Sequence, residues 1–361
     1  MRRLRVADLF CGAGGLSLGL RMAGFEPVFA ADFDRHACST YARNLGAHVH
    51  NLDLAQTEPE ELADLVTREC GGADVVAGGA PCQGFSVQRR GAPIDARNDL
   101  VLRFGKFATT LNPQAIVLEN VPTILGQRGK AYLDRVVQEW DTAGYEVHRA
   151  VLEAAAYGVP QFRRRAFVVG IRRDLGTHFQ FPSPRLKPGQ YVTVRDAIGN
   201  LPPPPEDFSE HPGHPNHRRV AVSEINLERL RHVPEGGGRL DVPARLQLPC
   251  HRNPNGHRHL DVFGRLWWDR PSGTLTAMFD NFTRGRFAHP EQTRNITGRE
   301  GARLQSFPDD FVFLGPKKDV ARQIGNAVAP LMAKAVGEAL LHALAYPGRA
   351  VEQPRQRVLA L

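Results

Sequence analysis

The chain has 361 residues, of which 42% are hydrophobic and 23% charged, and it carries a formal net charge of +8. This length suggests about two domains at roughly 150 residues each, and the composition is ordinary for a protein that buries a core. No apolar run approaches the roughly 20 residues of a membrane-spanning helix, which excludes an integral membrane protein and favours a cytoplasmic one.

The charge and the cysteines narrow the class of protein further. A modest excess of positive charge is compatible with a polyanionic partner and equally with a basic enzyme that has none. The five cysteines are odd in number, and no two stand at a Cys-x-x-Cys spacing. This argues against a disulfide framework and against a structural zinc site, so no metal is expected.

Short apolar runs alternate with helical patterns from residue 5 to about 170. One helix is predicted after each of the first two strands. The first runs from about Leu16 to Ala23, and the second ends at about Leu45. The apolar runs predict strands at 6–10, 27–31, 47–50, 73–77 and 115–118, and a closing pair at 147–152 and 166–169. Strands spaced by helices favour an α/β fold whose parallel sheet is covered on both faces.

The character of the sequence changes after Ile171. Prolines interrupt the chain from Pro182 to Pro205, and residues 191–298 hold 14 arginines, 12 acidic residues and no lysine. Arginine suits phosphate and guanine edges, although solvated arginines in a loop-rich domain are an equal alternative. A helical pattern returns at about Thr297, and Pro330 is placed to begin a last helix that ends near Ala345.

A glycine-rich turn follows the first strand, in Asp8-Leu9-Phe10-Cys11-Gly12-Ala13-Gly14-Gly15-Leu16. Glycines between a strand and a helix let the backbone approach a ligand closely, which is compatible with any nucleotide-like cofactor. Asp32 could hold ribose hydroxyls, Phe33 could stack on adenine, and Asp53 could accept from an adenine amino group. The alternative is that Asp32 and Asp34 only cap the next helix.

One cysteine stands where a ligand would bind. Cys82, in Gly79-Ala80-Pro81-Cys82-Gln83, follows the fourth strand, at the carboxyl edge of the predicted sheet. Small residues around it allow a substrate ring to approach. Most single cysteines are inert core residues, so the position alone does not make Cys82 a nucleophile.

The order of several sequence blocks is more specific. They resemble the DNA (cytosine-5) methyltransferase family of the bacterial restriction-modification type. Besides the turn at 8–16, the blocks are Pro81-Cys82-Gln83, Glu119-Asn120-Val121, Gln161-Phe162-Arg163-Arg164-Arg165, residues 299–308 and residues 323–330. The resemblance spans about residues 6–346, with one divergent gap at about 185–298 where this family places its target-recognition domain.

The resemblance implies both the reaction and its catalytic residues. Cys82 would attack C6 of a flipped cytosine, and Glu119 would hold the N3 edge with a protonated carboxyl. Arg163 and Arg165 would stabilise the cytosine carbonyl oxygen and orient Glu119 or Cys82. Alternation along a strand places these two arginines on one face and Arg164 on the other.

The resemblance also implies the ligands. The methyl donor would be S-adenosyl-L-methionine, and duplex DNA would be the partner. The residues expected to contact the methyl donor are Phe10, Gly12, Gly14, Gly15, Leu16, Asp32, Phe33, Asp53, Leu54, Pro81 and Asn326. The residues expected to contact DNA are Gln83, Ser86, Arg97, Arg258, Arg265, Thr274, Arg284 and Arg286. Trp267 and Trp268, which interleave with these arginines, are expected to form the core of the small domain instead.

These inferences combine into one hypothesis and two rivals. The expected fold is a Rossmann-like methyltransferase sheet in residues 1–184, a loop-rich recognition domain in 185–298, and a return segment in 299–361 that completes the catalytic domain. We expect a monomeric DNA methyltransferase that acts beside a cognate restriction endonuclease or as an orphan enzyme. The rivals are a tRNA cytosine-5 methyltransferase with the same fold and a non-catalytic DNA-binding regulator.

Overall fold

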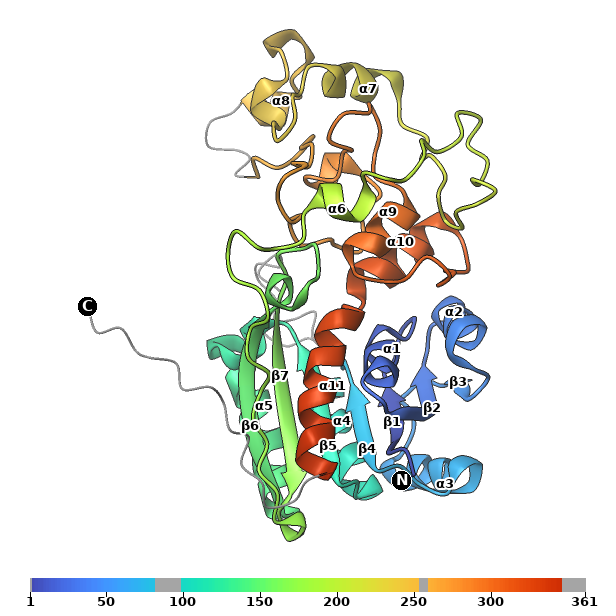
Figure 1. The fold of residues 1–361 in the computed structure, drawn as a ribbon, viewed down its shortest axis with the longest axis vertical. Coiled ribbons are helices and arrows are strands. Elements are labelled where there is room, and N and C mark those ends of the chain that lie inside the picture. The colour runs from blue at the N-terminus through green and yellow to red at the C-terminus, as the bar shows by residue number, and fades with distance from the viewer. Residues whose placement is uncertain (1, 82–98, 253–258, 346–361) are drawn as a thin grey trace, which may run out of the picture.

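A seven-stranded sheet organises the chain in the computed structural model, which describes residues 2–81, 99–252 and 259–345 (Figure 1). The strand order is β3-β2-β1-β4-β5-β7-β6. The strands are β1 (Arg5–Leu9), β2 (Glu26–Asp32), β3 (Val49–Asn51), β4 (Val75–Gly78), β5 (Ala115–Asn120), β6 (Tyr145–Glu153) and β7 (Arg164–Arg172). Each predicted strand is present, with bounds that differ by a few residues.

The sheet is parallel except at one strand. β1 pairs with β2 and β4, β2 with β3, and β4 with β5, all in parallel. β7 is antiparallel to both of its neighbours, β5 and β6. The prediction of a parallel sheet therefore misses β7, because β6 and β7 form a hairpin-like pair without a crossover helix between them.

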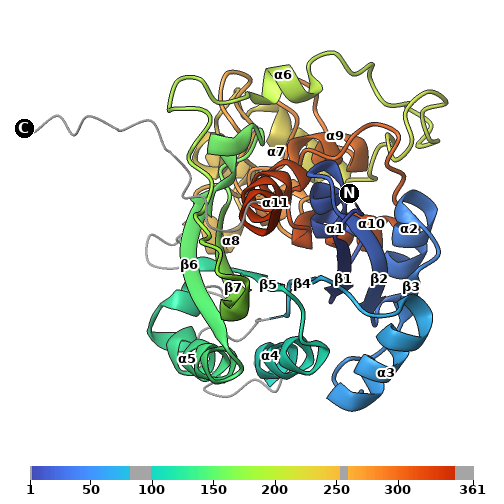
Figure 2. The ribbon, with the colours of Figure 1, turned by 60° about the horizontal axis from the view of Figure 1, so that its bottom comes forward.

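Helices cover both faces of the sheet (Figure 2). α3 (Pro59–Cys70), α4 (Asp99–Leu111) and α5 (Gln127–Thr142) lie on one face. α1 (Gly15–Met22), α2 (Arg35–Leu45) and α11 (Pro330–Ala345) lie on the other. Consecutive strand residues contribute to opposite clusters: Val6 and Val75 pack on the α11 side, whereas Ala7 and Val76 pack on the α4 side. Burial on both faces explains why these strands read as continuous apolar runs.

The last helix returns to the sheet from the far end of the sequence. Pro330 is its first residue, as predicted, and α11 packs along α1. At Gly19 a β-carbon would lie 2.4 Å from both the Pro330 carbonyl oxygen and the Ala333 β-carbon, so only glycine permits this close approach. The segment Lys317–Ala345 is long and apolar enough to cross a membrane by composition, but more than half of its most apolar stretch is buried, which is typical of a core helix.

The remaining residues form an irregular region with short helices, at the top of Figure 1. Its α-helices are α6 (Val194–Ile198), α7 (Glu224–Arg231), α8 (Pro249–Arg252), α9 (Gly298–Leu304) and α10 (Lys317–Asn326). Single 3-10 turns occur in this region at Arg239–Asp241, Ala244–Leu246 and Phe282–Arg284. Others follow strands of the sheet, at Pro122–Leu125, Ala154–Tyr157 and Arg173–Leu175. One apolar cluster joins Val194 and Trp268 to Ala302 and Ile324, so it crosses the predicted boundary at 298–299. The division into three segments stays a prediction.

A buried ion pair joins the first turn of α9 to the loop that precedes it. The Glu300 carboxylate is 1% exposed and accepts two bonds of 2.7 Å from the Arg294 guanidinium, and a third of 2.7 Å from the Thr297 amide. Burial alone would raise the pKa of Glu300, but the charge and hydrogen bonds of Arg294 outweigh it and lower the pKa to about 2.

Glu300→Gln is expected to destabilise the fold by about 3–5 kcal/mol, because it leaves the Arg294 charge buried without a counterion. Urea unfolding at pH 7 measures this loss. Since the pKa is lowered from 4.5 to about 2, the stabilisation is complete above pH 4.5 and disappears as the pH falls towards 2. The control is Glu206→Gln, at an exposed pair with Arg219. Equal unfolding midpoints for the two variants would contradict the prediction.

Candidate active site

The glycine-rich turn lies at the carboxyl edge of the sheet, where β1 ends. The Gly12 amide donates to Asp32 Oδ2 at 2.9 Å, which ties the turn to the end of β2. Phe10, Gly12 and Gly14 all have positive φ angles, of 59°, 54° and 94°. A β-carbon on Gly12 would meet nothing within 4 Å, so the backbone there faces open space. The turn is thus an open cradle of the kind that glycine permits.

The other side of the same turn rests against the return segment. At Gly15 a β-carbon would lie 2.3 Å from the Val328 carbonyl oxygen and 3.4 Å from the Ala327 β-carbon. Asn326, one residue earlier and exposed, ends α10. The structure therefore brings Asn326 near the turn despite more than 300 residues between them in sequence, as the prediction required.

Polar and aromatic side chains follow β2 and β3 at the same edge. Asp32 accepts from the amides of Gly12 and Asp34, and burial raises the pKa of its carboxyl. The neighbouring Phe33 is 69% exposed. Asp53 follows β3 and is exposed. An exposed ring beside carboxylates fits an adenosine group, which offers an aromatic face and hydroxyl donors.

Two expected cofactor contacts are placed differently from the rest. Leu16 and Leu54 are almost fully buried and belong to the clusters on the two faces of the sheet. Their side chains serve the core, so only their backbones remain available to a ligand. Asp34 both caps α2, accepting from the amides of His36 and Ala37, and pairs with Arg322. The capping alternative therefore holds for Asp34.

A buried glutamate ends β5. Glu119 is 8% exposed, and the Arg165 Nε donates to its Oε1 at 2.9 Å. β7 is antiparallel, so its first residues lie opposite the end of β5, with Glu119 paired to Phe167. Burial raises the pKa of Glu119, although the positive charges of Arg165 and Arg163 oppose that rise. A carboxyl with a raised pKa keeps its proton to higher pH, as a proton donor requires.

The backbone that leads to Cys82 lies beside this glutamate. A β-carbon on Gly79 would lie 3.3 Å from Glu119 Oε2. The Asn120 side chain donates from Nδ2 to the Ala80 carbonyl at 3.1 Å. The sequence does not indicate that Asn120 holds residue 80, because a side chain that bonds a distant backbone carbonyl leaves no local sequence pattern. Cys82 itself lies outside the described residues.

The two arginines predicted to act together do not share a role. Arg165 contacts Glu119, as expected. Arg163 is 1% exposed, and its terminal nitrogens donate to the carbonyls of Leu275, Gly325 and Ala327. The terminal nitrogens of Arg163 therefore bond the protein backbone, and not a cytosine as the prediction expected. Alternation along the strand is confirmed by the exposure of Arg164.

Two arginines predicted to contact DNA are instead structural. Arg265 is 4% exposed and donates to the carbonyls of Leu230, Val233, His289 and Gln292 and to Thr293 Oγ1. Arg286 donates to three carbonyls and to Asp261, with its guanidinium 4.1 Å from the Trp267 ring. Both guanidiniums satisfy loop carbonyls that no regular ladder pairs. Trp268 is buried in the core, as predicted, whereas Trp267 is only half-buried and stacks against Arg270 and Arg286.

Two other residues in the DNA-binding prediction remain accessible. Arg284 and Thr274 are exposed, and Thr274 Oγ1 donates to the Phe162 carbonyl at 2.7 Å. Thr274 thus lies beside the segment that carries Arg163 and Arg165. Four residues of that prediction, Gln83, Ser86, Arg97 and Arg258, lie outside the described residues.

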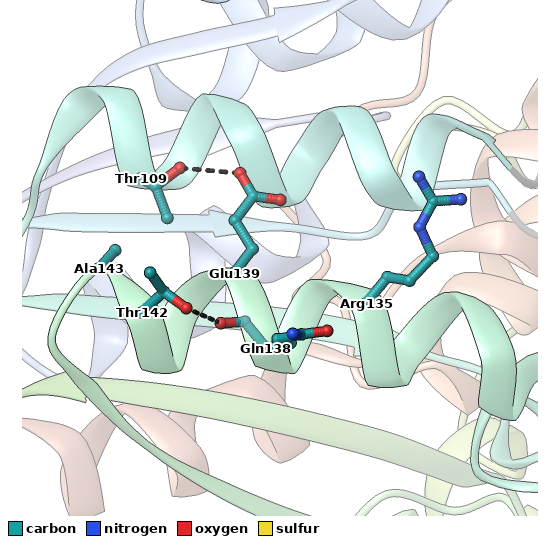
Figure 3. Close-up of a pocket in the computed structure, with 6 residues that line it drawn as sticks. All are labelled: Thr109, Arg135, Gln138, Glu139, Thr142 and Ala143. Carbon is teal, nitrogen blue, oxygen red and sulfur yellow. Dashed lines mark hydrogen bonds between the residues drawn. The ribbon is translucent and has the colours of Figure 1, made fainter.

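A separate groove of about 440 Å³ lies between α4 and α5 (Figure 3). It is lined by Thr109, Arg135, Gln138, Glu139, Thr142 and Ala143. Thr109 and Thr142 come from the last turns of their helices, which lie near the amino ends of the strands in a parallel α/β unit. The groove is therefore at the opposite edge of the sheet from Glu119 and is no part of the site.

Known proteins are similar to this chain over most of its length. A family model described as C-5 cytosine-specific DNA methylase matches residues 4–342. The chain is 36% identical over 335 residues to the Type II methyltransferase M.NgoFVII of Neisseria gonorrhoeae, covering 90% of this chain and 83% of that one. It is 37% identical over 342 residues to the Type II methyltransferase M1.HphI of Haemophilus parahaemolyticus, covering 94% and 87%.

A solved structure gives the same result for the fold. The crystal structure of a DNA modification methyltransferase encoded within an E. coli prophage matches with a TM-score of 0.74 and 26% identity, covering 95% of this chain and all of that one. The fold is thus the Rossmann-like one of S-adenosylmethionine-dependent methyltransferases. The chain belongs to the C-5 cytosine-specific DNA methylase family. The family and enzyme class predicted from the sequence are confirmed.

Proposed function

We propose that the protein transfers a methyl group to C5 of a cytosine that it flips out of duplex DNA, with Cys82 as the nucleophile. The observation that carries the proposal is the buried Glu119 carboxyl, which Arg165 orients and whose pKa burial raises. It lies beside the Gly79 backbone that leads to Cys82. A proton donor and a thiol at one sheet edge suit addition to a pyrimidine ring.

In the first step, the Cys82 thiolate forms a bond to C6 of cytosine. The C5=C6 electron pair shifts towards C4, and the C4=N3 pair moves to N3, which takes the proton of Glu119. C5 thereby becomes nucleophilic enough to accept a methyl group. A base then removes the C5 proton, the C6–S bond breaks to return the thiolate, and the N3 proton returns to Glu119.

The methyl donor we propose is S-adenosyl-L-methionine, which supplies an electrophilic methyl group on a sulfonium and leaves as a neutral thioether. The open backbone at Gly12 would let the donor approach closely, the carboxylate of Asp32 would hold its ribose, and the exposed ring of Phe33 would stack on its adenine. Asp53 would accept a hydrogen bond from the amino group of the adenine, and Asn326 would also contact the methyl donor.

The target carbon is inaccessible in a stacked duplex, so the nucleotide must flip into the site. Thr274 is the described residue best placed to contact it, because its hydroxyl is bonded to Phe162, between Gln161 and Arg163. We further propose that the protein acts as a cytoplasmic monomer and that a cognate restriction endonuclease accompanies it, since its relatives are Type II methyltransferases.

Arg284→Ala is expected to weaken binding to duplex DNA and to reduce the slope of log affinity against log salt by about 1, with the melting temperature unchanged, because Arg284 is exposed. Arg265→Ala should lower the melting temperature by several degrees, because it removes a buried guanidinium that donates to the carbonyls of Leu230, Val233, His289 and Gln292. Salt-dependent binding and thermal unfolding measure the two effects. The reverse pattern would restore Arg265 as the DNA contact.

The function is tested by offering the purified chain labelled S-adenosylmethionine with duplex DNA or with tRNA. We expect label in the DNA, in cytosine at C5, and none in tRNA. Label in tRNA alone would establish the RNA methyltransferase instead. Binding to DNA without any labelling would favour the non-catalytic regulator.

A further inference from the structure

Three segments far apart in the sequence meet at Arg163. The first is residues 161–163, and the second is residues 272–276 of the irregular region. The third is the return segment, which contributes residues 304–305 and 324–327. We call this contact the junction. It lies between the loop that carries Thr274 and the turn that carries Asn326.

The first segment holds Leu275 by both of its backbone groups. The Leu275 amide donates to Gln161 Oε1 at 2.9 Å, and its carbonyl accepts from Arg163 Nη1 at 3.1 Å. Between them, the Phe162 amide donates to the Ser272 carbonyl at 2.8 Å, and the Phe162 carbonyl accepts from Thr274 Oγ1. The position of the loop 272–276 is therefore set by residues 161–163.

The same arginine also holds the end of α10. Arg163 Nη2 donates to the carbonyls of Gly325 and Ala327, both at 2.9 Å. These carbonyls belong to the residues on either side of Asn326, so the guanidinium holds the backbone on both sides of the residue proposed to contact the methyl donor. Gln305 supports the turn by donating to the Ile324 carbonyl at 2.7 Å.

The loop and the turn also touch each other directly. A β-carbon on Gly325 would lie 2.2 Å from the Thr276 carbonyl oxygen, so glycine is required for this contact. Only a planar fork with several donors can bond Leu275 on one side and the Gly325–Ala327 turn on the other at once. A lysine ammonium carries its three donors on one nitrogen and cannot span both.

We propose that Arg163, supported by Gln161, is a positioning residue that links the loop 272–276 to the turn 325–327, so that binding of the target nucleotide and binding of the methyl donor strengthen each other. This inference rests on the proposed function, because the two ligands are those proposed above. Coupling of this kind is reciprocal: DNA tightens donor binding by the factor by which the donor tightens DNA binding. The competing role is direct contact with cytosine through Arg163 Nε, which is buried and bonds no described residue.

The link itself is tested in the ligand-free, full-length chain by hydrogen exchange. Arg163→Lys is expected to speed amide exchange about 10-fold or more in peptides that cover 272–276 and in those that cover 324–328. Arg164→Lys, at the exposed neighbour, should leave both unchanged. Faster exchange in only one of the two segments, or in neither, would show that Arg163 does not join them.

The coupling is tested by the affinity for S-adenosylhomocysteine, which binds without reacting, measured with and without plasmid duplex DNA. We expect the DNA to tighten binding at least about 5-fold in the original chain and in Arg164→Lys, but less than 2-fold in Arg163→Lys. Full coupling in Arg163→Lys together with a large loss of kcat would assign Arg163 to cytosine contact and overturn the proposal.

Two further results keep these outcomes separate. If Arg163→Lys does not fold, Gly325→Ala disturbs the junction from the other side and is expected to lose the coupling in the same way; retained coupling there would contradict the proposal. If the original chain binds neither S-adenosylhomocysteine nor DNA, the proposed function fails, whereas the exchange experiment still decides whether Arg163 links the two segments.

Discussion

Cys82→Ser is expected to lower methyl transfer to DNA by about 10⁴-fold or more, while S-adenosylmethionine still binds with nearly unchanged affinity. A serine hydroxyl is not ionised near neutral pH and adds poorly to C6, whereas a thiol with a pKa of about 8.5 supplies some thiolate. Removal of a nucleophile commonly costs an enzyme several orders of magnitude in kcat. Single-turnover transfer and equilibrium binding measure the two quantities.

The matched control is Cys250→Ser, at an exposed cysteine of the irregular region. It should leave transfer unchanged. If Cys82→Ser retains more than about a tenth of the original rate, the thiol is not the nucleophile, and the mechanism proposed for the site is wrong.

Glu119→Gln is expected to lower kcat by about 10²- to 10⁴-fold, the usual contribution of a general acid. Glutamine can still donate a hydrogen bond to N3 but cannot give up a proton to it. Because burial raises the pKa of Glu119, its protonated form persists to higher pH than in a free glutamate, and activity falls as the pH rises through that raised pKa. The activity of Glu119→Gln should no longer fall as the pH rises through this range.

Glu139→Gln is the control for burial alone. Glu139 is also partly buried, and burial raises the pKa of its carboxyl as well, but it bonds Thr109 in the groove between α4 and α5, away from the site (Figure 3). Its replacement should leave both kcat and the pH profile unchanged. A pH profile that keeps its alkaline limb in Glu119→Gln would mean that another group protonates N3.

The sequence predicted the sheet well because the sheet is buried on both faces. Runs such as Val75–Gly78 and Ala115–Asn120 are apolar at every position facing a helix, and glycine or proline bounds many of them. The direction of β7 was not predictable from such runs, because a strand reads the same in either direction. Pro330 predicted the start of α11 correctly, since its fixed φ suits the first helical position.

The site was predicted unevenly, for a physical reason. Glu119 lies at the end of a strand, and Phe33 and the glycine turn follow strands directly, so the order of strands places them at one edge of the sheet. For Arg163 and Arg265 the structure shows contacts other than those predicted, because sequence does not show whether an arginine turns outwards to phosphate or inwards to unpaired carbonyls. Both have their guanidiniums in loop-rich surroundings, where such carbonyls are common.

The most direct test of the central claim is bisulfite sequencing of DNA from a methylation-deficient bacterial host that expresses the full chain. We predict 5-methylcytosine within one recurring short sequence, and none in a host that expresses Cys82→Ser at the same level. DNA without 5-methylcytosine, from cells that contain the folded protein, would contradict the claim that this chain methylates cytosine in DNA.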